Sequence, residues 1–84
     1  REVDGLVNNK VLEFRKKIPF REREILDRRI YSDSPMTLQS LGDRLSLSRE
    51  RVRQLEKQIV EDLKGYLATE IHDFDEFAQY AYSA

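Results

Sequence analysis

One run of ten residues, 48–57, constrains the fold of this chain more than any other, and it reads Ser-Arg-Glu-Arg-Val-Arg-Gln-Leu-Glu-Lys. On a helical wheel of about 100° per residue, its long polar side chains fall within about 140° of one another. These side chains are Arg49, Glu50, Arg53, Gln54 and Lys57. The opposite side carries the apolar residues Val52, Leu55, Ile59 and Leu63. The spacing predicts an amphipathic helix that buries one stripe and projects the other.

The residues before this run supply a second, shorter helix and a turn. Ser48 suits the N-cap of the long helix, because its hydroxyl can accept a hydrogen bond from an unpaired backbone N–H. Residues 37–45 predict a short helix that Thr37 caps, with a three-residue turn at 46–48. Two helices joined in this way are typical of a helix-turn-helix.

The apolar positions agree with that motif over residues 37–57. Counted from Leu38, the fourth, eighth, tenth, fifteenth and eighteenth residues are apolar. The fifth is Gly42, which lets two helices approach closely. Ser46 departs from the pattern, since glycine is common at this place, and we expect either a left-handed backbone there or a slightly different turn.

The remainder of the chain also predicts helices. Apolar spacing favours one helix over residues 4–17 and another over 20–30, with a loop at 31–36. The first helix would pack with Leu6, Val7, Val11 and Phe14. No stretch alternates apolar and polar residues for long. We therefore expect an all-α fold, a small helical domain of four to five helices containing a helix-turn-helix.

The motif residues resemble region 4 of bacterial sigma-70-type sigma factors. The resemblance depends on Thr37, Leu38 and Leu41, and above all on the Arg-Glu-Arg-Val-Arg-Gln run at 49–54. Residues 18–26 are similar to the preceding helix of that family, although Phe20 stands where an acidic or small polar residue is common. Serine before the run and valine within it resemble the heat-shock-type factors more than the primary one. The similarity covers about residues 19–67.

The resemblance implies promoter recognition during transcription initiation, with the second helix of the motif in the major groove of the minus-35 element. The implied base-contacting residues are Arg49, Glu50, Arg53 and Gln54. The expected DNA-backbone contacts are Arg21, Arg29, Thr37, Ser48, Arg51 and Lys57. The implied partners are promoter double-stranded DNA and RNA polymerase core, through the flap of its beta subunit, with activators or anti-sigma factors as further partners.

The chemistry of the polar stripe suits base recognition without reference to the family. Arginine can donate two parallel hydrogen bonds to guanine, glutamate can accept one from the amino group of cytosine, and glutamine suits adenine. Each good bidentate contact provides about 1–3 kcal/mol of discrimination. A few such contacts can select a short site, but they cannot define a whole promoter.

The charge is unevenly distributed. The chain has 15 basic and 16 acidic residues, a net charge of −1. All 15 basic residues and 12 acidic ones lie in residues 1–64, which gives this part a net charge of +3. The other four acidic residues are Glu70, Asp73, Asp75 and Glu76. We expect weak DNA binding by the isolated domain, a shallow dependence on salt, and a need for tethering to polymerase.

The last part of the chain has a different composition, so we divide the sequence into a helix-turn-helix domain at 1–67 and an acidic, aromatic tail at 68–84. Gly65 marks an expected break in the long helix. The tail has apolar residues spaced for a short amphipathic helix, at Ile71, Phe74, Phe77 and Ala78 or Ala81. It could cover the core, contact a regulator or polymerase, or compete with DNA for Arg49 and Arg53.

Two other kinds of function remain as alternatives to a sigma region. A free-standing regulator would usually dimerise, and the sequence offers no separate dimerisation helix. A protein-binding helical module would treat the polar stripe as a solvated surface with intrahelical charge pairs. Loss of DNA binding on Arg53→Ala would separate the protein-binding module from a sigma region.

Catalysis has no support in the sequence, which lacks a glycine-rich loop or a nucleophile with its base. The single histidine, His72, lies among acidic residues and is expected to be exposed. The chain has no cysteine, and we expect no metal and no cofactor. No signal peptide or apolar stretch of about 20 residues is present, which favours a cytoplasmic, membrane-free location. A start at Arg1 without methionine suggests a fragment of a longer protein.

Overall fold

One long helix, α4, organises the structure. The computed structural model describes residues 2–71. Its helices are α1 (Glu2–Lys17), α2 (Phe20–Ile25), the π-helical segment η1 (Leu26–Ile30), α3 (Leu38–Leu45) and α4 (Arg49–Glu70). Each of the others contacts α4. The expected all-α class and the helix-turn-helix are confirmed, and the described residues contain no strand.

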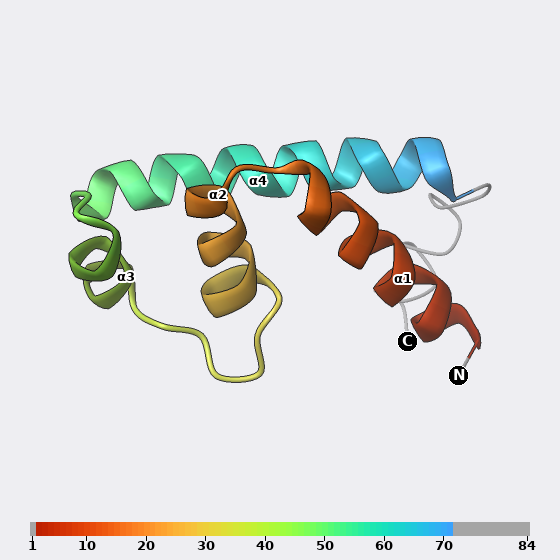
Figure 1. The fold of residues 1–84 in the computed structure, drawn as a ribbon, viewed down its shortest axis with the longest axis horizontal. Helices are drawn as coiled ribbons and strands as arrows, with labels where there is room; N and C mark the ends of the chain where they lie inside the picture. Colours follow the sequence, from red (N-terminus) through yellow and green to blue (C-terminus); the bar gives the residue numbers. More distant parts are fainter. Residues whose placement is uncertain (1, 72–84) are drawn as a thin grey trace.

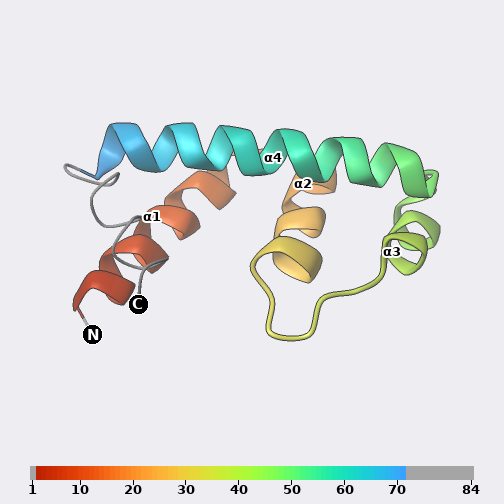
Figure 2. The ribbon, with the colours of Figure 1, turned by 180° about the vertical axis from the view of Figure 1, so that it is seen from behind.

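The shorter helices all lie on one side of α4. Figure 1 shows α3 at the N-terminal end of α4, α1 along its C-terminal half, and α2 between them. The reverse view in Figure 2 shows the same order. The first turns of α4 therefore belong to the helix-turn-helix, whereas its last turns hold α1.

The hydrophobic core takes residues from every part of this arrangement. Its buried members are Phe14, Ile25, Leu26, Leu41, Val52 and Ile59. The motif residues Leu38, Leu45, Leu47 and Leu55 are partly buried and pack against this cluster. The apolar stripe predicted for the long helix therefore faces the core. By contrast, Leu6 of α1 is 46% exposed and contributes little to it.

A close backbone contact shapes the turn between α3 and α4. Ser46 adopts a left-handed conformation with φ 60° and ψ 43°, which is one of the two outcomes expected for a non-glycine residue there. The Leu47 N–H then donates to the Gly42 carbonyl over 2.8 Å. A Cβ atom on Gly42 would lie 2.6 Å from the Leu47 carbonyl oxygen. The expected need for a small residue at this place is confirmed.

Two helical boundaries differ from the sequence prediction. α1 begins at Glu2 rather than at residue 4. The helix predicted over residues 20–30 is α-helical only as far as Ile25 and continues as η1. Within η1, the Tyr31 N–H donates to the Leu26 carbonyl over 2.8 Å, the five-residue spacing of a π-helix. Ile25 and Leu26, adjacent in sequence, are both buried.

The expected break at Gly65 is wrong, because α4 continues through it to Glu70. Packing against α1 supports this part of the helix: the rings of Phe14 and Tyr66 are 5.6 Å apart, and the Tyr66 hydroxyl donates to Glu13 over 2.9 Å. Glycine costs a helix interior only about 1 kcal/mol relative to alanine. The tertiary contacts outweigh that cost.

The proposed division after residue 67 remains a prediction. Helix α4 crosses this point, and Ile71, which follows it, is buried. The rest of the expected amphipathic tail segment, together with His72, lies outside the described residues. Among residues 2–71, no helix has the length and apolar character needed to cross a membrane.

The same substitution at two glycines should have opposite effects on stability. Gly65 is exposed and has open space around it, so Gly65→Ala should stabilise the fold by about 0.8–1 kcal/mol through helix propensity. Gly42→Ala should destabilise it by about 1–3 kcal/mol, because the new methyl group meets the Leu47 backbone. Urea unfolding of the 84-residue chain measures both. A loss of stability on Gly65→Ala would show that α4 is interrupted there.

Glu24 should make the stability depend on pH. Its Oε1 atom accepts from Arg28 over 2.8 Å and from Arg44 of α3 over 2.9 Å. Hydrogen bonds from Arg28 and then Arg44 lower the pKa of Glu24. A lowered pKa stabilises the fold above the pKa of the unfolded glutamate, and this contribution disappears as pH falls through the folded value.

Glu24→Gln should therefore melt below wild type at neutral pH, and the difference should close as the solution is acidified. Thermal unfolding between about pH 7 and about pH 3 measures this convergence. Glu61→Gln, which changes an exposed carboxylate on α4, is the matched control and should leave the melting temperature close to wild type at neutral pH. A constant difference between Glu24→Gln and wild type across the range would contradict the assignment.

Candidate nucleic-acid interface

Two side-chain caps define where the helices of the motif begin. The Thr37 hydroxyl accepts from the Ser40 backbone N–H over 3.0 Å at the start of α3. The Ser48 hydroxyl accepts from the Arg51 N–H over 3.0 Å at the start of α4. Both caps were expected from the sequence and are confirmed. They fix the first turn of α4, where the polar stripe begins.

The polar stripe of α4 faces solvent. Its members Arg49, Glu50, Arg53, Gln54 and Lys57 are all exposed. On the other side of the same turns, Val52 is fully buried and Ile59 nearly so. The structure thus brings the four expected base-contacting residues together on the first turns of one exposed helical face, which we call the reading face.

Side chains of the reading face pair with one another. Arg53 Nε donates to Glu50 Oε1 over 3.0 Å, and Arg53 Nη2 contacts Glu50 Oε2. Gln54 also donates to Glu50, over 3.5 Å. The Glu50 and Arg53 side chains are 59% and 55% exposed, so water competes with their pairing and the contact contributes little to stability. These groups can therefore exchange their mutual bonds for bonds to bases.

The ion pair with Arg53 also favours the ionised form of Glu50. The hydrogen bond from Arg53 lowers the pKa of Glu50 below its usual range, and Glu50 in turn raises the pKa of Arg53. At neutral pH, Glu50 is therefore an ionised acceptor beside a permanent donor. Such a pair offers opposite hydrogen-bonding groups to neighbouring bases.

Two expected backbone-contacting residues line one groove beside the reading face. Arg21 of α2 and Arg51 of α4 share this groove with Pro19, Phe20, Glu22 and Leu55. Arg21 and Arg51 are exposed, as are Ser48, Thr37 and Lys57. Phe20 is 66% exposed, the most exposed of the large apolar side chains in the described part of the chain. The groove thus has two arginines, one glutamate and an apolar wall.

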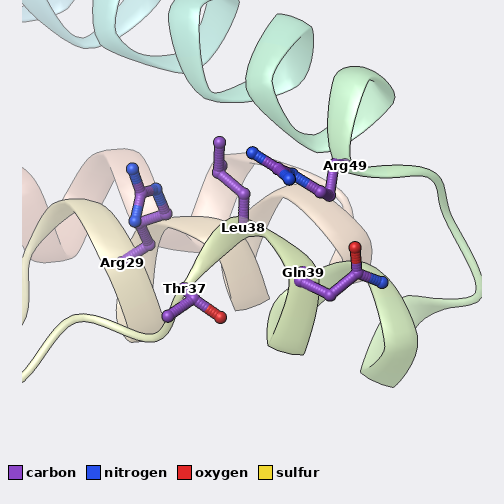
Figure 3. Close-up of a pocket in the computed structure, with 5 residues that line it drawn as sticks. All are labelled: Arg29, Thr37, Leu38, Gln39 and Arg49. Carbon is purple, nitrogen blue, oxygen red and sulfur yellow. The ribbon is translucent and has the colours of Figure 1, made fainter.

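A second pocket lies between the start of α3 and the start of α4. It is lined by Arg29, Thr37, Leu38, Gln39 and Arg49 (Figure 3). In this view the Arg49 side chain extends from α4 toward Leu38, while Gln39 projects from the first turn of α3. Sequence reasoning missed Gln39. Its position in the first turn of α3, two residues after the cap Thr37, was the sequence signal that could have pointed to it.

Arg29 differs from the other expected backbone contacts. Its side chain is only 27% exposed, and its Nε lies 2.9 Å from Glu56 Oε2 on α4. Its Nη1 donates to the Met36 carbonyl over 2.9 Å. The structure therefore places Arg29 at the wall of the pocket, with its guanidinium already engaged within the protein.

Comparison with known proteins identifies the family of this fold. Residues 16–65 match the family described as Sigma-70, region 4. The chain is 37% identical over 75 residues to the RNA polymerase sigma-B factor of Myxococcus xanthus, an alignment that covers 89% of this chain and 30% of that protein. It is 38% identical over 69 residues to the sigma-C factor of the same organism, covering 82% and 23%.

A third relative is the RNA polymerase sigma factor RpoH of Zymomonas mobilis, 42% identical over 64 residues, which cover 75% of this chain and 21% of the relative. The chain thus spans less than a third of the length of these relatives. No solved structure is significantly similar to it. The match to the family model spans the helix-turn-helix and the groove beside it, and the chain belongs to the sigma-70 region 4 family.

Proposed function

We propose that this chain recognises the minus-35 element of promoters by placing the first turns of α4 in the major groove. The observation that carries the proposal is the reading face, in which Arg49, Glu50, Arg53 and Gln54 are exposed on a capped helix whose other side is buried. A major groove admits an α-helix, and these side chains can form the hydrogen bonds that distinguish base pairs.

The neighbouring groups have the chemistry of phosphate contacts. Arg21, Arg51 and Lys57 supply exposed positive charge, and Thr37 and Ser48 lie at helix N-termini, where the helix dipole favours an anion. Gln39 adds an amide beside Arg49 at the edge of the pocket. We assign these residues to binding the DNA backbone, which fixes the register of α4 without reading sequence.

The proposed setting is transcription initiation, with the chain held on RNA polymerase core through the beta-subunit flap. The near-neutral charge of the chain supports this setting, because few released counterions give weak binding in isolation. A tether supplies effective concentration instead of affinity. The chain would act in the cytoplasm as a binding module rather than as an enzyme. Similarity to RpoH supports assignment to the heat-shock-type factors.

Phe20 favours a protein contact in addition to DNA. Its exposed ring lies in the groove with Pro19 and Leu55, next to Arg21 and Arg51. The flap, an activator or an anti-sigma factor could use this apolar surface, and contact with such a protein does not exclude DNA binding. A free-standing regulator has no comparable supporting feature in the described residues.

Arg53→Ala should remove sequence preference. Fluorescence anisotropy at low salt would compare binding to a duplex carrying a minus-35 sequence and to a scrambled duplex. We expect the preference of wild type to fall by about five-fold to a hundred-fold in the variant, because a bidentate base contact is lost. Lys64→Ala, which removes the same charge about four turns beyond Arg49, should weaken binding to both duplexes alike.

An unchanged preference in Arg53→Ala would refute the assignment of Arg53 to a base. If wild type itself shows no preference at low salt, the same titration with the beta flap added tests the tether. Failure of that titration too would leave the reading face as a protein-binding surface.

A further inference from the structure

Arg29 contacts both the start of α3 and helix α4. The two helices must keep a fixed orientation to each other for α4 to enter the DNA major groove. Through Nη1, Arg29 binds the Met36 carbonyl, one residue before the α3 cap Thr37. Through Nε it approaches Glu56 of α4. The Met36 N–H is also bound, by the Arg28 carbonyl over 2.9 Å. The start of α3 and the third turn of α4 are thus both fixed to η1.

Glu56 lies on α4 where a contact can fix the rotation of the helix about its own axis. It is seven residues after Arg49 and three after Arg53, at about 340° on a wheel with Arg49 at zero. That direction falls between the buried Val52 and the exposed Arg53. A contact at this edge opposes rotation of the helix about its own axis. Rotation about that axis decides which side chains face the bases.

The electrostatics of Arg29 favour an internal role over a phosphate contact. Its buried Nε has no hydrogen-bond partner in the described residues. The Glu56 carboxylate lies 2.9 Å from this atom in an ion pair that is not aligned as a hydrogen bond, and it compensates the charge of the guanidinium. The two side chains are 27% and 24% exposed. To bind a phosphate, Arg29 would have to leave both Glu56 and Met36. Arg21 and Arg51 are exposed, and Arg51 has only a 3.5 Å contact with the Gln54 side chain to give up.

From these contacts we infer that the Arg29–Glu56 pair positions the reading face, and that Arg29 affects DNA binding through α4 and the start of α3 rather than by touching DNA. The inference rests on the proposed function for its effect on binding. It differs from the role that the family resemblance gave to Arg29. The π-helical turn explains why the sequence did not reveal the pair, since its wider spacing redirects Arg29 relative to an α-helical wheel.

Glu56→Gln gives the decisive test, because the two roles of Arg29 predict opposite results. Removal of a negative charge near DNA should by itself strengthen binding. Loss of the positioning contact should instead weaken binding to the minus-35 duplex, by roughly three-fold or more at the same salt. Arg29→Ala should weaken binding to a similar extent, and the double variant should bind no worse than the weaker single variant.

The dependence of binding on salt separates a positioning residue from a phosphate contact. Arg29→Ala should leave the slope of log affinity against log salt unchanged, whereas the control Arg21→Ala should reduce it by about one. Arg29→Lys keeps the charge but not the planar fork that reaches two partners. It should therefore behave like Arg29→Ala. Rescue by lysine, a reduced slope in Arg29→Ala, or tighter binding by Glu56→Gln would each overturn the inference.

Unfolding of the full 84-residue chain provides a readout that does not require DNA. Arg29→Lys and Glu56→Gln should each lower the melting temperature by about 5 °C, and their effects should not add in the double variant. Additive changes in melting temperature, or no change in either single variant, would overturn the inferred Arg29–Glu56 pair. If wild type failed to prefer the minus-35 duplex both alone and with the beta flap added, the proposed function would fail, while a non-additive thermal effect would still establish the pair.

Discussion

The direction of α4 depends on the close contact between Gly42 of α3 and the turn that precedes α4. The Leu47 N–H bonds to the Gly42 carbonyl, and the Leu47 carbonyl occupies the space that a Cβ on residue 42 would need. Ser46 accepts a left-handed backbone to let the chain reverse there. With Leu41 and Val52 fully buried on the two sides of this turn, α4 leaves it in one direction only. The reading face, the two pockets and the Arg29–Glu56 pair all depend on that direction.

Much of the motif could be predicted because its determinants are local. Thr37 and Ser48 each cap a backbone group three residues ahead, so the signal and its effect lie within one turn. The alternation of Val52 and Ile59 with Arg53 and Lys57 follows directly from helical periodicity. The family resemblance then assigned functions to a surface whose exposure the periodicity had already indicated.

The features that the sequence did not reveal depend on partners far away in the chain. Gly65 is a local signal for a break, but Tyr66 packs on Phe14 of α1, and a pattern read along one segment does not contain that contact. Similarly, the π-helical spacing of η1 and the approach of Arg29 to Glu56 follow from how η1 packs on α4. Arg29 was expected at a phosphate because the family resemblance places it there, and the sequence alone does not show that its side chain is partly buried beside Glu56. Gln39 was overlooked because its place in one pocket with Arg49 depends on how α3 packs beside α4.

The continuity of α4 gives the domain a mechanical property. A helix of 22 residues is about 33 Å long. Its first turns present the reading face at Arg49, which we propose meets DNA bases, and its last turns pack on α1 at Tyr66. Between these two ends Ile59 is buried in the core, so one continuous helix connects the reading face with the surface that packs on α1. Because a continuous helix is stiff over this length, a displacement of α1 would be transmitted to the reading face. Such coupling would pass through one rigid element and would need no relay of side-chain rearrangements between the two ends.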